Sequence, residues 1–256
     1  MTAQFGAIVK EWRAIRRVSQ LDLSLRAALS ARHLSFLESG RAAPSRMMVL
    51  RLAEALEMPK PVVNRALAAA GFSGAYPTAA EDAPDMRWAR RARERLLDNH
   101  GPYPGVAVDR QWNVVAANNG ALRLFSIAGD APAANMIELL LALGETSVVA
   151  NWEEIAALAL TRLRAEIAHL GGDAVLERFA ARLSTHPRLP PHVAPPRDRV
   201  MIPMLINVEG ARLSVFSVIG QFGSAQEIAL SELKVELMFP ADAETEAWFA
   251  ASDTGR

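Results

Sequence analysis

The segment Ser19–Ser45 constrains the fold of this 256-residue chain more than any other stretch. Its first half, Gln20–Ala27, contains Leu21 and Leu25 one helical turn apart, and Ala28 follows at the i+7 position. This spacing predicts a short helix with those three residues on its inward face. Ala28 and the residue after it then form a turn.

A second short helix is predicted directly after that turn. Ser30 is placed to cap the helix Ala31–Glu38, because its hydroxyl can accept hydrogen bonds from free backbone N–H groups. The helix is expected to bury Leu34 and Leu37, and Gly40 provides its C-terminal cap. Two such helices joined by a three- or four-residue turn form a helix-turn-helix, whose second helix can enter the major groove of DNA.

The spacing of this segment resembles the phage-repressor (XRE-type) helix-turn-helix class. Ala28 departs from that class, which usually has glycine in the turn, and alanine is strained at a positive φ. The alternative interpretation is an ordinary helical hairpin in an all-α domain. The residues that match the class are Gln20, Ala27, Leu29, Leu34, Leu37, Glu38, Gly40, Arg41, Pro44 and Ser45.

If the segment binds DNA, its residues divide by chemistry. Gln20 and Ser30 are expected at phosphates, because helix N-termini favour anions. Arg32 and Ser35 are the candidates for base edges. Ala31 and Phe36 are expected to make apolar contacts to a thymine methyl, and His33 and Arg41 to contact the DNA backbone. The core positions are expected to be Leu25, Leu29, Leu34 and Leu37.

The distribution of charge supports a nucleic-acid partner for the first quarter of the chain only. The net charge is zero, but residues 1–71 contain 11 Lys/Arg and five Asp/Glu, a balance of +6. The remaining residues contain 17 Lys/Arg and 23 Asp/Glu, a balance of −6. This asymmetry is typical of a chain in which one module meets phosphates. Chance clustering of surface charge is the alternative.

The rest of the composition excludes several classes of protein. There are no cysteines, so no disulfide or thiolate metal site can form, which fits a reducing cytoplasm. Neither a signal peptide nor an apolar run long enough to span a bilayer is evident, so no membrane association is expected. The five histidines show no metal-ligand spacing, and no catalytic or phosphate-binding motif is found. We therefore expect neither an enzyme nor a metal site.

The chain divides into three parts on these patterns. Residues 1–72 are predicted to form a compact five-helix domain. Residues 73–100 form a linker and a charged connecting helix, Met86–His100, with Trp88, Ala92 and Leu96 along one side. That helix could equally be the first helix of the second domain. Residues 101–256 form the second domain.

The second domain is predicted to be an antiparallel sheet with helices packed on it, as in PAS-like sensor folds. Together with the first domain this gives an α + (α+β) fold class. The strands are expected at 106–108, 114–117, Val200–Val208, Leu213–Val218 and Leu233–Phe239, with helices at Asn135–Leu143, Asn151–His169, Asp173–Leu183 and Glu244–Ala251.

Three segments of this second domain resemble the ligand-binding domain of MmyB-like transcription regulators. They are YPGVAVDRQWNVVAANNGALRLF (Tyr103–Phe125), NWEEIAALALTRLRAEI (Asn151–Ile167) and ELKVELMFPADAETEAW (Glu232–Trp248). The join between the domains, LAAAGF (Leu67–Phe72) followed by Tyr76, also matches. The resemblance implies an apolar cavity that accepts a fatty acid or a similar apolar effector, and no other cofactor.

Candidate residues for lining such a cavity are mainly aromatic residues and methionines, because pockets are mostly apolar with a few polar anchors. Arg162 could pair with a ligand carboxylate, or else form a surface salt bridge. For each of the others the alternative is ordinary core packing. The candidates are Trp112, Phe125, Trp152, Arg162, Met201, Met204, Phe216 and Phe222.

The sequence therefore predicts a cytoplasmic, sequence-specific regulator that binds an operator in double-stranded DNA and senses a small apolar ligand. A homodimer on two half-sites about one helical turn apart is expected, because one such domain contacts few base pairs. The competing hypothesis is a DNA-binding regulator whose second domain is a protein-interaction or dimerisation module without a ligand. An enzyme with a vestigial DNA-binding domain is a third hypothesis, and would require a polar, convergent pocket.

Overall fold

The computed structural model describes residues 2–79, 83–128, 134–191, 199–208 and 210–251. The chain forms two compact units, and the first consists mainly of the residues up to Thr78. Separate clusters of buried apolar side chains form the cores of the two units. Among the described residues, no helix has both the length and the apolar character needed to cross a bilayer.

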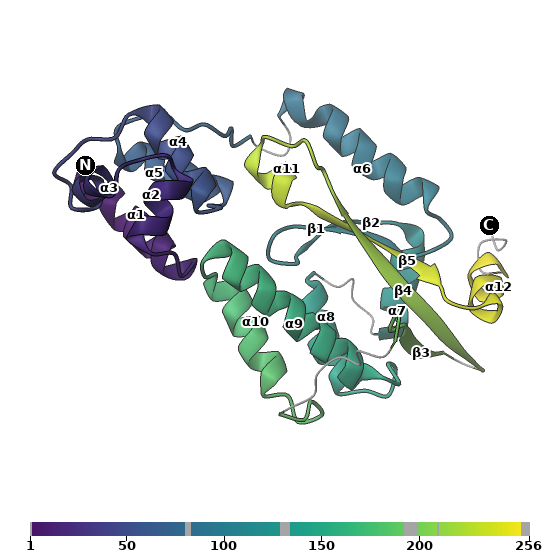
Figure 1. Cartoon of the computed structure of the whole chain (residues 1–256). Helices are drawn as coiled ribbons and strands as arrows, with labels where there is room; N and C mark the ends of the chain where they lie inside the picture. Colours follow the sequence, from purple (N-terminus) through teal and green to yellow (C-terminus); the bar gives the residue numbers. More distant parts are fainter. Residues whose placement is uncertain (1, 80–82, 129–133, 192–198, 209, 252–256) are drawn as a thin grey trace. The chain divides into compact units, whose positions relative to one another are not determined.

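The first unit is the predicted five-helix domain (Figure 1). The apolar stripe of its first helix is buried as expected, since Phe5, Val9 and Trp12 are at most 1% exposed. The side chains of Leu34 and Leu37 are fully buried in the same core. The helices of this unit are α1 (Thr2–Ile15), α2 (Gln20–Arg26), α3 (Ala31–Glu38), α4 (Arg46–Ala55) and α5 (Lys60–Ala69).

The inward face predicted for α2 is wrong. Leu21 and Leu25 are 60% and 70% exposed, whereas Leu23 and Ala27 are buried. Both pairs have i, i+4 spacing, so a seven-residue helix offers two competing apolar stripes, and packing against the other helices selects the second. Ala28 has φ 51°, the left-handed conformation that the turn requires and that favours glycine.

A buried carboxylate links the first three helices of this unit. Glu38 is 4% exposed and accepts hydrogen bonds from Arg13 Nε at 2.9 Å and from Gln20 Nε2 at 3.0 Å. These residues lie in α3, α1 and α2 respectively. The two donors balance the burial of a charge that would otherwise be costly, so the start of α2 is held against the end of α3.

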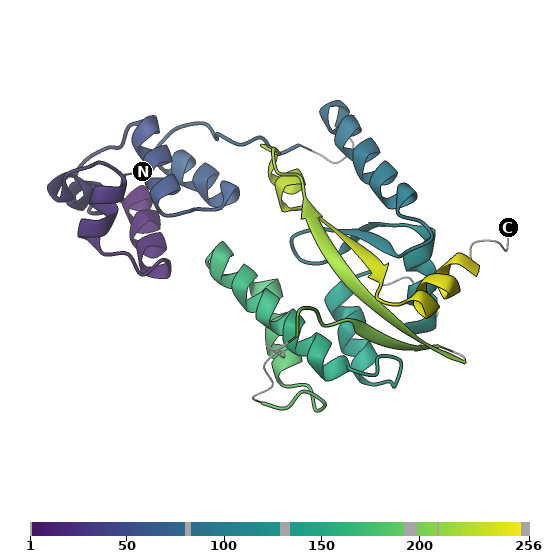
Figure 2. The ribbon, with the colours of Figure 1, turned by 45° about the vertical axis from the view of Figure 1, so that its right-hand side comes forward.

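The second unit is built on a five-stranded antiparallel sheet with the strand order β2-β1-β5-β4-β3. This confirms the predicted PAS-like sheet. Figure 2 shows that the sheet twists strongly along β4, its longest strand. Strand bounds differ from the prediction mainly at β3, which begins at Met204, and at β4, which continues to Gln221. The strands are β1 (Gly105–Val108), β2 (Val114–Ala117), β3 (Met204–Val208), β4 (Ala211–Gln221) and β5 (Lys234–Pro240).

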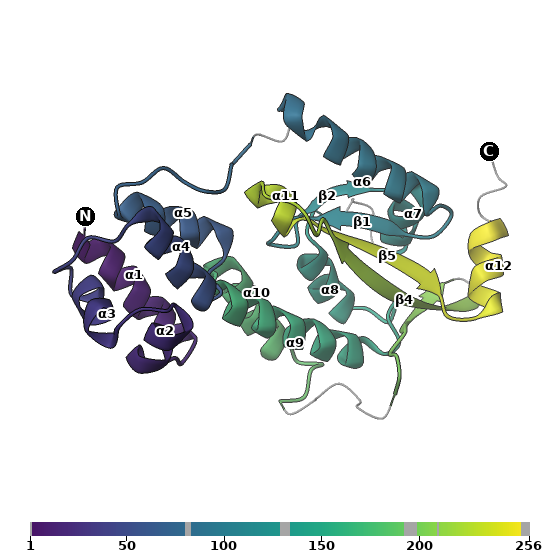
Figure 3. The same cartoon turned by 45° about the horizontal axis from the view of Figure 1, so that its top comes forward.

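Helices cover both faces of this sheet. In Figures 1 and 3, α8 and α9 lie over one face and α6 runs along the other. The alternation of β5 agrees: Val235 packs with the buried residues of α6, while Met238 lies on the opposite face. The helices are η1 (Pro84–Met86, a 3-10 turn), α6 (Arg87–Asn99), α7 (Asn119–Ala128), α8 (Met136–Gly144), α9 (Trp152–Leu170), α10 (Ala174–Ser184), α11 (Ile228–Glu232) and α12 (Ala243–Ala251).

The stripe of large apolar residues on α6 faces outward. Ala89 and Leu97 are the buried apolar positions of this helix, and they pack with β1 and β5 residues. Trp88 and Leu96 lie one position earlier and are 62% and 44% exposed. The helix therefore packs through small and medium side chains and leaves an exposed aromatic residue on its outer side.

Candidate functional site

The outer face of α3 presents the candidate DNA-contact residues. Ala31, Arg32 and Ser35 are exposed, and the Arg32 guanidinium lies 5.5 Å from the centre of the Phe36 ring. This cation–π pair orients the arginine over a half-buried aromatic ring on the same helix. The N-terminal end of α3 thus presents a cation, a small side chain and a hydroxyl on one surface.

The remaining candidates on this surface have specific partners. Ser30 caps α3 by accepting a hydrogen bond from the N–H of His33 at 3.1 Å. The Nε2 atom of His33 contacts the sulfur of Met48 at 3.3 Å. Gln20 uses its side-chain amide on Glu38, so any phosphate contact at α2 falls to the N-terminal backbone N–H groups and neighbouring side chains. Arg41 is exposed, and its backbone N–H donates to Phe36 O at 2.9 Å.

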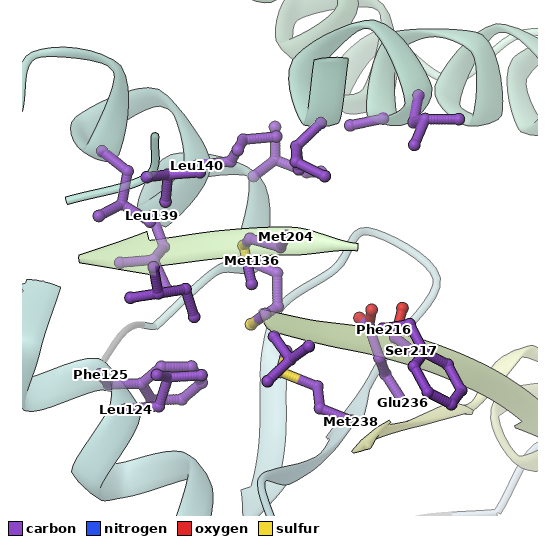
Figure 4. A pocket seen from close by; sticks show the side chains of 18 of the residues that line it. Leu124, Phe125, Met136, Leu139, Leu140, Met204, Phe216, Ser217, Glu236 and Met238 are labelled. Carbon is purple, nitrogen blue, oxygen red and sulfur yellow. The ribbon is translucent and has the colours of Figure 1, made fainter. Parts of the chain in front are cut away.

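A cavity of about 190 Å³ lies in the second unit between the sheet and helices α7, α8 and α9 (Figure 4). An enclosed apolar space of about 150 Å³ is enough to hold benzene. The cavity therefore has room for part of an apolar molecule as it stands. Its walls are mostly aliphatic and aromatic, and besides Arg162, Ser217 and Glu236 they contain no hydroxyl or charged side chain among the described residues.

One helical stripe forms the α9 wall of the cavity. Ile155, Leu158, Ala159 and Arg162 follow i, i+3, i+4, i+7 spacing and all line the cavity. The stripe is apolar for about two turns and ends in a guanidinium. Arg162 is exposed to solvent, and the structure gives it no carboxylate partner among the described residues. The alternative role of a surface salt bridge is therefore not seen.

The β1–β2 hairpin fixes Trp112 at the cavity wall. Asp109 Oδ1 accepts hydrogen bonds from the N–H groups of Gln111 and Asn113 at 2.8 and 2.9 Å. Trp112 adopts φ 67° in this turn, and its carbonyl accepts from Met136 N at 2.9 Å. The side chain is 4% exposed as a result. The turn thus holds a strained aromatic residue in one position beside the cavity.

Two cationic side chains lie beside Trp112 near the start of β5, and of these only Arg162 lines the cavity. Lys234 Nζ lies 4.0 Å from the Trp112 ring centre, and the Arg162 guanidinium lies 5.6 Å from it. Glu236 is two residues beyond Lys234 on the same face of β5. Figure 4 shows the oxygens of Glu236 and Ser217 on one side of the cavity, away from Leu124 and Phe125. The cavity therefore has one polar and one apolar side.

Five of the eight candidate lining residues do line the cavity: Trp112, Phe125, Arg162, Met204 and Phe216. Phe216 is on the opposite face of the sheet from Ser217, and its ring stacks on Phe239 there. It nevertheless lines the cavity.

The other three candidates do not line the cavity. Trp152 is a core residue, since it is fully buried and its Nε1 donates to Leu140 O at 2.7 Å. Met201 is 48% exposed and precedes β3, whereas its neighbour Ile202 lines the cavity. Phe222 packs with the cluster on the α6 side of the sheet.

Glu236 and Ser217 also line the cavity, although they were not predicted from the sequence. Their residue types alone did not indicate a place in a cavity wall, because each is a polar residue in a predicted strand. A usable signal did exist: Glu236 lies between Lys234 and Met238 on one face of a strand whose other face is apolar. No group of three or more acidic or histidine side chains among the described residues is arranged to hold a metal ion.

The comparisons with known proteins agree with this architecture. Residues 89–251 match the family model of the MmyB-like transcription regulator ligand binding domain. No curated protein matches the chain. The matched segment includes most of the sheet unit and every element of the cavity, and it is more than half of the chain. The family is one of transcription regulators, not of enzymes. The chain belongs to the MmyB-like transcription regulator ligand-binding-domain family.

Proposed function

We propose that this protein is a cytoplasmic, sequence-specific DNA-binding regulator whose sheet unit binds a fatty-acid-like effector. The observation on which this depends most is the apolar cavity in a domain of a transcription regulator family. An apolar cavity favours a sensor over the competing hypothesis of a protein-interaction module, which would have a solidly packed core. We place the end of the DNA-binding domain at residue 72, and we assign α6 to the sensing domain because it packs on the sheet and lies mostly within the family match.

The proposal for DNA binding rests on α3 and its surroundings. The helix has an exposed N-terminal face with Arg32 and Ser35, and a positive φ at Ala28 in the turn before it. Arg32 would read a guanine edge, and Arg41 would contact the phosphate backbone. Ser30, Ala31, His33 and Phe36 complete the proposed contact surface with Gln20 at the start of α2.

The homodimer remains part of the proposal. Trp88 and Leu96 give α6 an exposed apolar stripe, and aromatic residues are enriched in protein interfaces. A dimer through this helix would pair two recognition helices on two half-sites. An effector that binds one arrangement of the dimer more tightly than another would then shift the dimer toward the first arrangement.

The experiment that tests the DNA-binding half selects bound sequences from a random duplex library with the purified protein. We expect an enriched motif with two half-sites. Arg32→Ala should relax specificity at one base of each half-site, at a cost of about 1–3 kcal/mol for that base. Arg41→Ala should weaken binding to all sequences about equally.

Arg65→Ala is the matched control, since Arg65 pairs with Glu11 at 3.8 Å and lies outside the proposed surface. Absence of any enriched motif, or equal effects of the Arg32 and Arg65 substitutions, would overturn the assignment of α3. Native mass spectrometry of the same preparation tests the effector half. A bound acyl compound near one per subunit supports the sensor, and a clean apo mass, with no binding of added acyl compounds, favours the interaction module.

A further inference from the structure

Glu236 places a carboxylate at the cavity wall without a partner among the described residues. Its side chain lines the cavity and is 9% exposed. Across the described residues, no donor forms a hydrogen bond or an ion pair with it. A carboxylate that faces a mostly apolar cavity without a protein donor can accept a hydrogen bond from a molecule bound there.

The strand pairing shows why the carboxylate faces the cavity. Glu236 pairs with Val106 of β1 and Ile219 of β4, and Ser217 pairs with Met238. Paired residues of antiparallel strands share a face, so Glu236, Met238 and Ser217 all lie on the cavity face of the sheet. Figure 4 shows the oxygens of Glu236 and Ser217 on the same side of the cavity. Two oxygen groups are therefore offered to one ligand end.

A simple fatty acid does not satisfy this end of the cavity. Its head group is a carboxylate, which Arg162 could bind, but a carboxylate near Glu236 would meet a like charge and provide no donor. A carboxylate accepts hydrogen bonds and donates none. A complementary ligand head must therefore contain a donor for Glu236 in addition to an acceptor for Arg162.

We infer that the effector is an acyl compound whose head group has a hydroxyl or amide N–H donor beside its carboxylate, and that Glu236 selects it over the plain fatty acid. Hydroxy fatty acids and N-acyl amino acids share this chemistry. The acyl chain would occupy the side of the cavity formed by Leu124 and Phe125. The inference rests on the proposed effector site and specifies its ligand.

The test compares matched ligands on the delipidated full-length protein by isothermal titration calorimetry. One pair is 3-hydroxydodecanoic acid and dodecanoic acid, which differ in a single hydroxyl. The second pair is N-dodecanoylglycine and its N-methyl derivative, which differ in the amide N–H. We expect the donor-bearing member of at least one pair to bind tenfold or more tightly, and the two pairs distinguish a hydroxyl from an amide source.

The Glu236→Met variant preserves side-chain length and removes the acceptor. We expect its preference between the members of that pair to fall below about twofold, with dodecanoic acid bound as well as or better than by the wild type. Glu236→Gln, which keeps one acceptor oxygen, should retain part of the preference. Glu177→Met changes an exposed glutamate of α10 outside the cavity and should leave the preference intact.

Each outcome decides between the proposals. If dodecanoic acid binds as tightly as its hydroxylated form, and the N-methyl compound as tightly as N-dodecanoylglycine, the effector site stands and the role of Glu236 is overturned. A preference that survives in Glu236→Met also overturns it. If no acyl compound binds, the effector half of the proposed function and the role of Glu236 both fall, while the DNA-binding half is decided by its own experiment. If Glu236→Met does not fold, Glu236→Gln decides the question, because an undiminished preference in that variant would overturn the role of Glu236.

Discussion

The two units of this protein use buried polar groups in different ways. In the helical unit, Glu38 is buried with Arg13 and Gln20 bonded to it, so the charge is balanced inside the protein. In the sheet unit, Glu236 is buried to a similar degree but faces a cavity and has no such partner among the described residues. The first arrangement fixes a shape. The second leaves an interaction open for another molecule.

The apolar cores differ in the same way. The helical unit has one continuous cluster of buried residues drawn from all five helices. The sheet unit has separate buried clusters on the two faces of its sheet, and the cavity lies between the sheet and α7, α8 and α9. Close-packed interiors respond to any change in side-chain volume, whereas a cavity can accept added volume. The predictions below use this difference.

The largest expected effect concerns a pair of asparagines, one in each unit. Asn118 Oδ1 accepts from Gly105 N and Ala121 N at 2.9 Å, and Nδ2 donates to Leu97 O and Tyr103 O at 2.9 Å. Because these groups are buried or partly buried, Asn118→Ala should destabilise the sheet unit by about 3 kcal/mol. Hydrogen exchange of each unit's amides measures the loss unit by unit.

Asn64 is the matched residue of the helical unit. It makes three comparable hydrogen bonds, to Ala75 N, Tyr76 N and Tyr76 O, but it is only half-buried. Water can replace its amide, so Asn64→Ala should destabilise the helical unit by only about 1 kcal/mol. Equal losses of stability for the two substitutions would contradict the argument that the hydrogen bonds of Asn118 are the more deeply buried.

A smaller effect is expected from adding volume to the two interiors. Ala53 is 4% exposed in the helical core, so Ala53→Leu should destabilise that unit by about 1–3 kcal/mol through overpacking. Ala159 lines the cavity, so Ala159→Leu should change the stability of the sheet unit by less than about 0.5 kcal/mol. Thermal unfolding measures both stabilities.

The same cavity substitution should have a functional cost that the core substitution lacks. Ala159→Leu occupies space that an acyl chain would fill, so acyl-ligand affinity should fall about tenfold, which calorimetry measures. Ala53→Leu should leave affinity unchanged as long as the sheet unit is folded. A large loss of stability in Ala159→Leu would show that the cavity wall is packed as tightly as the helical core.

The order and type of elements could largely be predicted from the sequence, because the hydrophobic periods are long and clear. The strand run Leu233–Phe239 has strict alternation and corresponds to β5 within one residue. Short helices were harder. In α2 the pairs Leu21/Leu25 and Leu23/Ala27 have the same spacing, so local pattern cannot select between them, and tertiary packing decides which pair is buried.

The cavity could be predicted only in part. Aromatic residues and methionines were reasonable candidates, but burial alone does not separate a core residue from a lining residue. Trp152 is packed in the core, where its indole N–H donates to the Leu140 carbonyl, and Phe222 lies on the other side of the sheet. The position of Glu236 depends on which face of β5 meets α8 and α9. That is a property of strand order and register, which no local pattern specifies.

The smallest effect expected concerns the caps of helices in the two units and their response to acid. In the helical unit, Ser30 and Ser45 cap α3 and α4 through hydroxyls, which do not titrate. In the sheet unit, Asp242 Oδ1 accepts from Thr245 N at 2.8 Å at the start of α12. The hydrogen bonds from the Thr245 backbone and side chain hold the pKa of Asp242 below its usual value of 3.8, against a smaller opposing effect of burial.

Because the pKa of Asp242 is lowered in the folded protein, acid should destabilise α12. A carboxylate whose pKa is lower in the folded state stabilises the fold fully above its unfolded pKa, and the stabilisation is lost as the pH falls below about 4 and through the folded pKa. Acidification should therefore weaken amide protection of α12 before that of α3 and α4. Asp242→Ser should remove this difference, because serine caps a helix without titrating, while Asp242→Ala should destabilise α12 by about 0.5–1 kcal/mol at neutral pH. Loss of α12 protection in acid that persists in Asp242→Ser would assign the sensitivity to another carboxylate of the sheet unit.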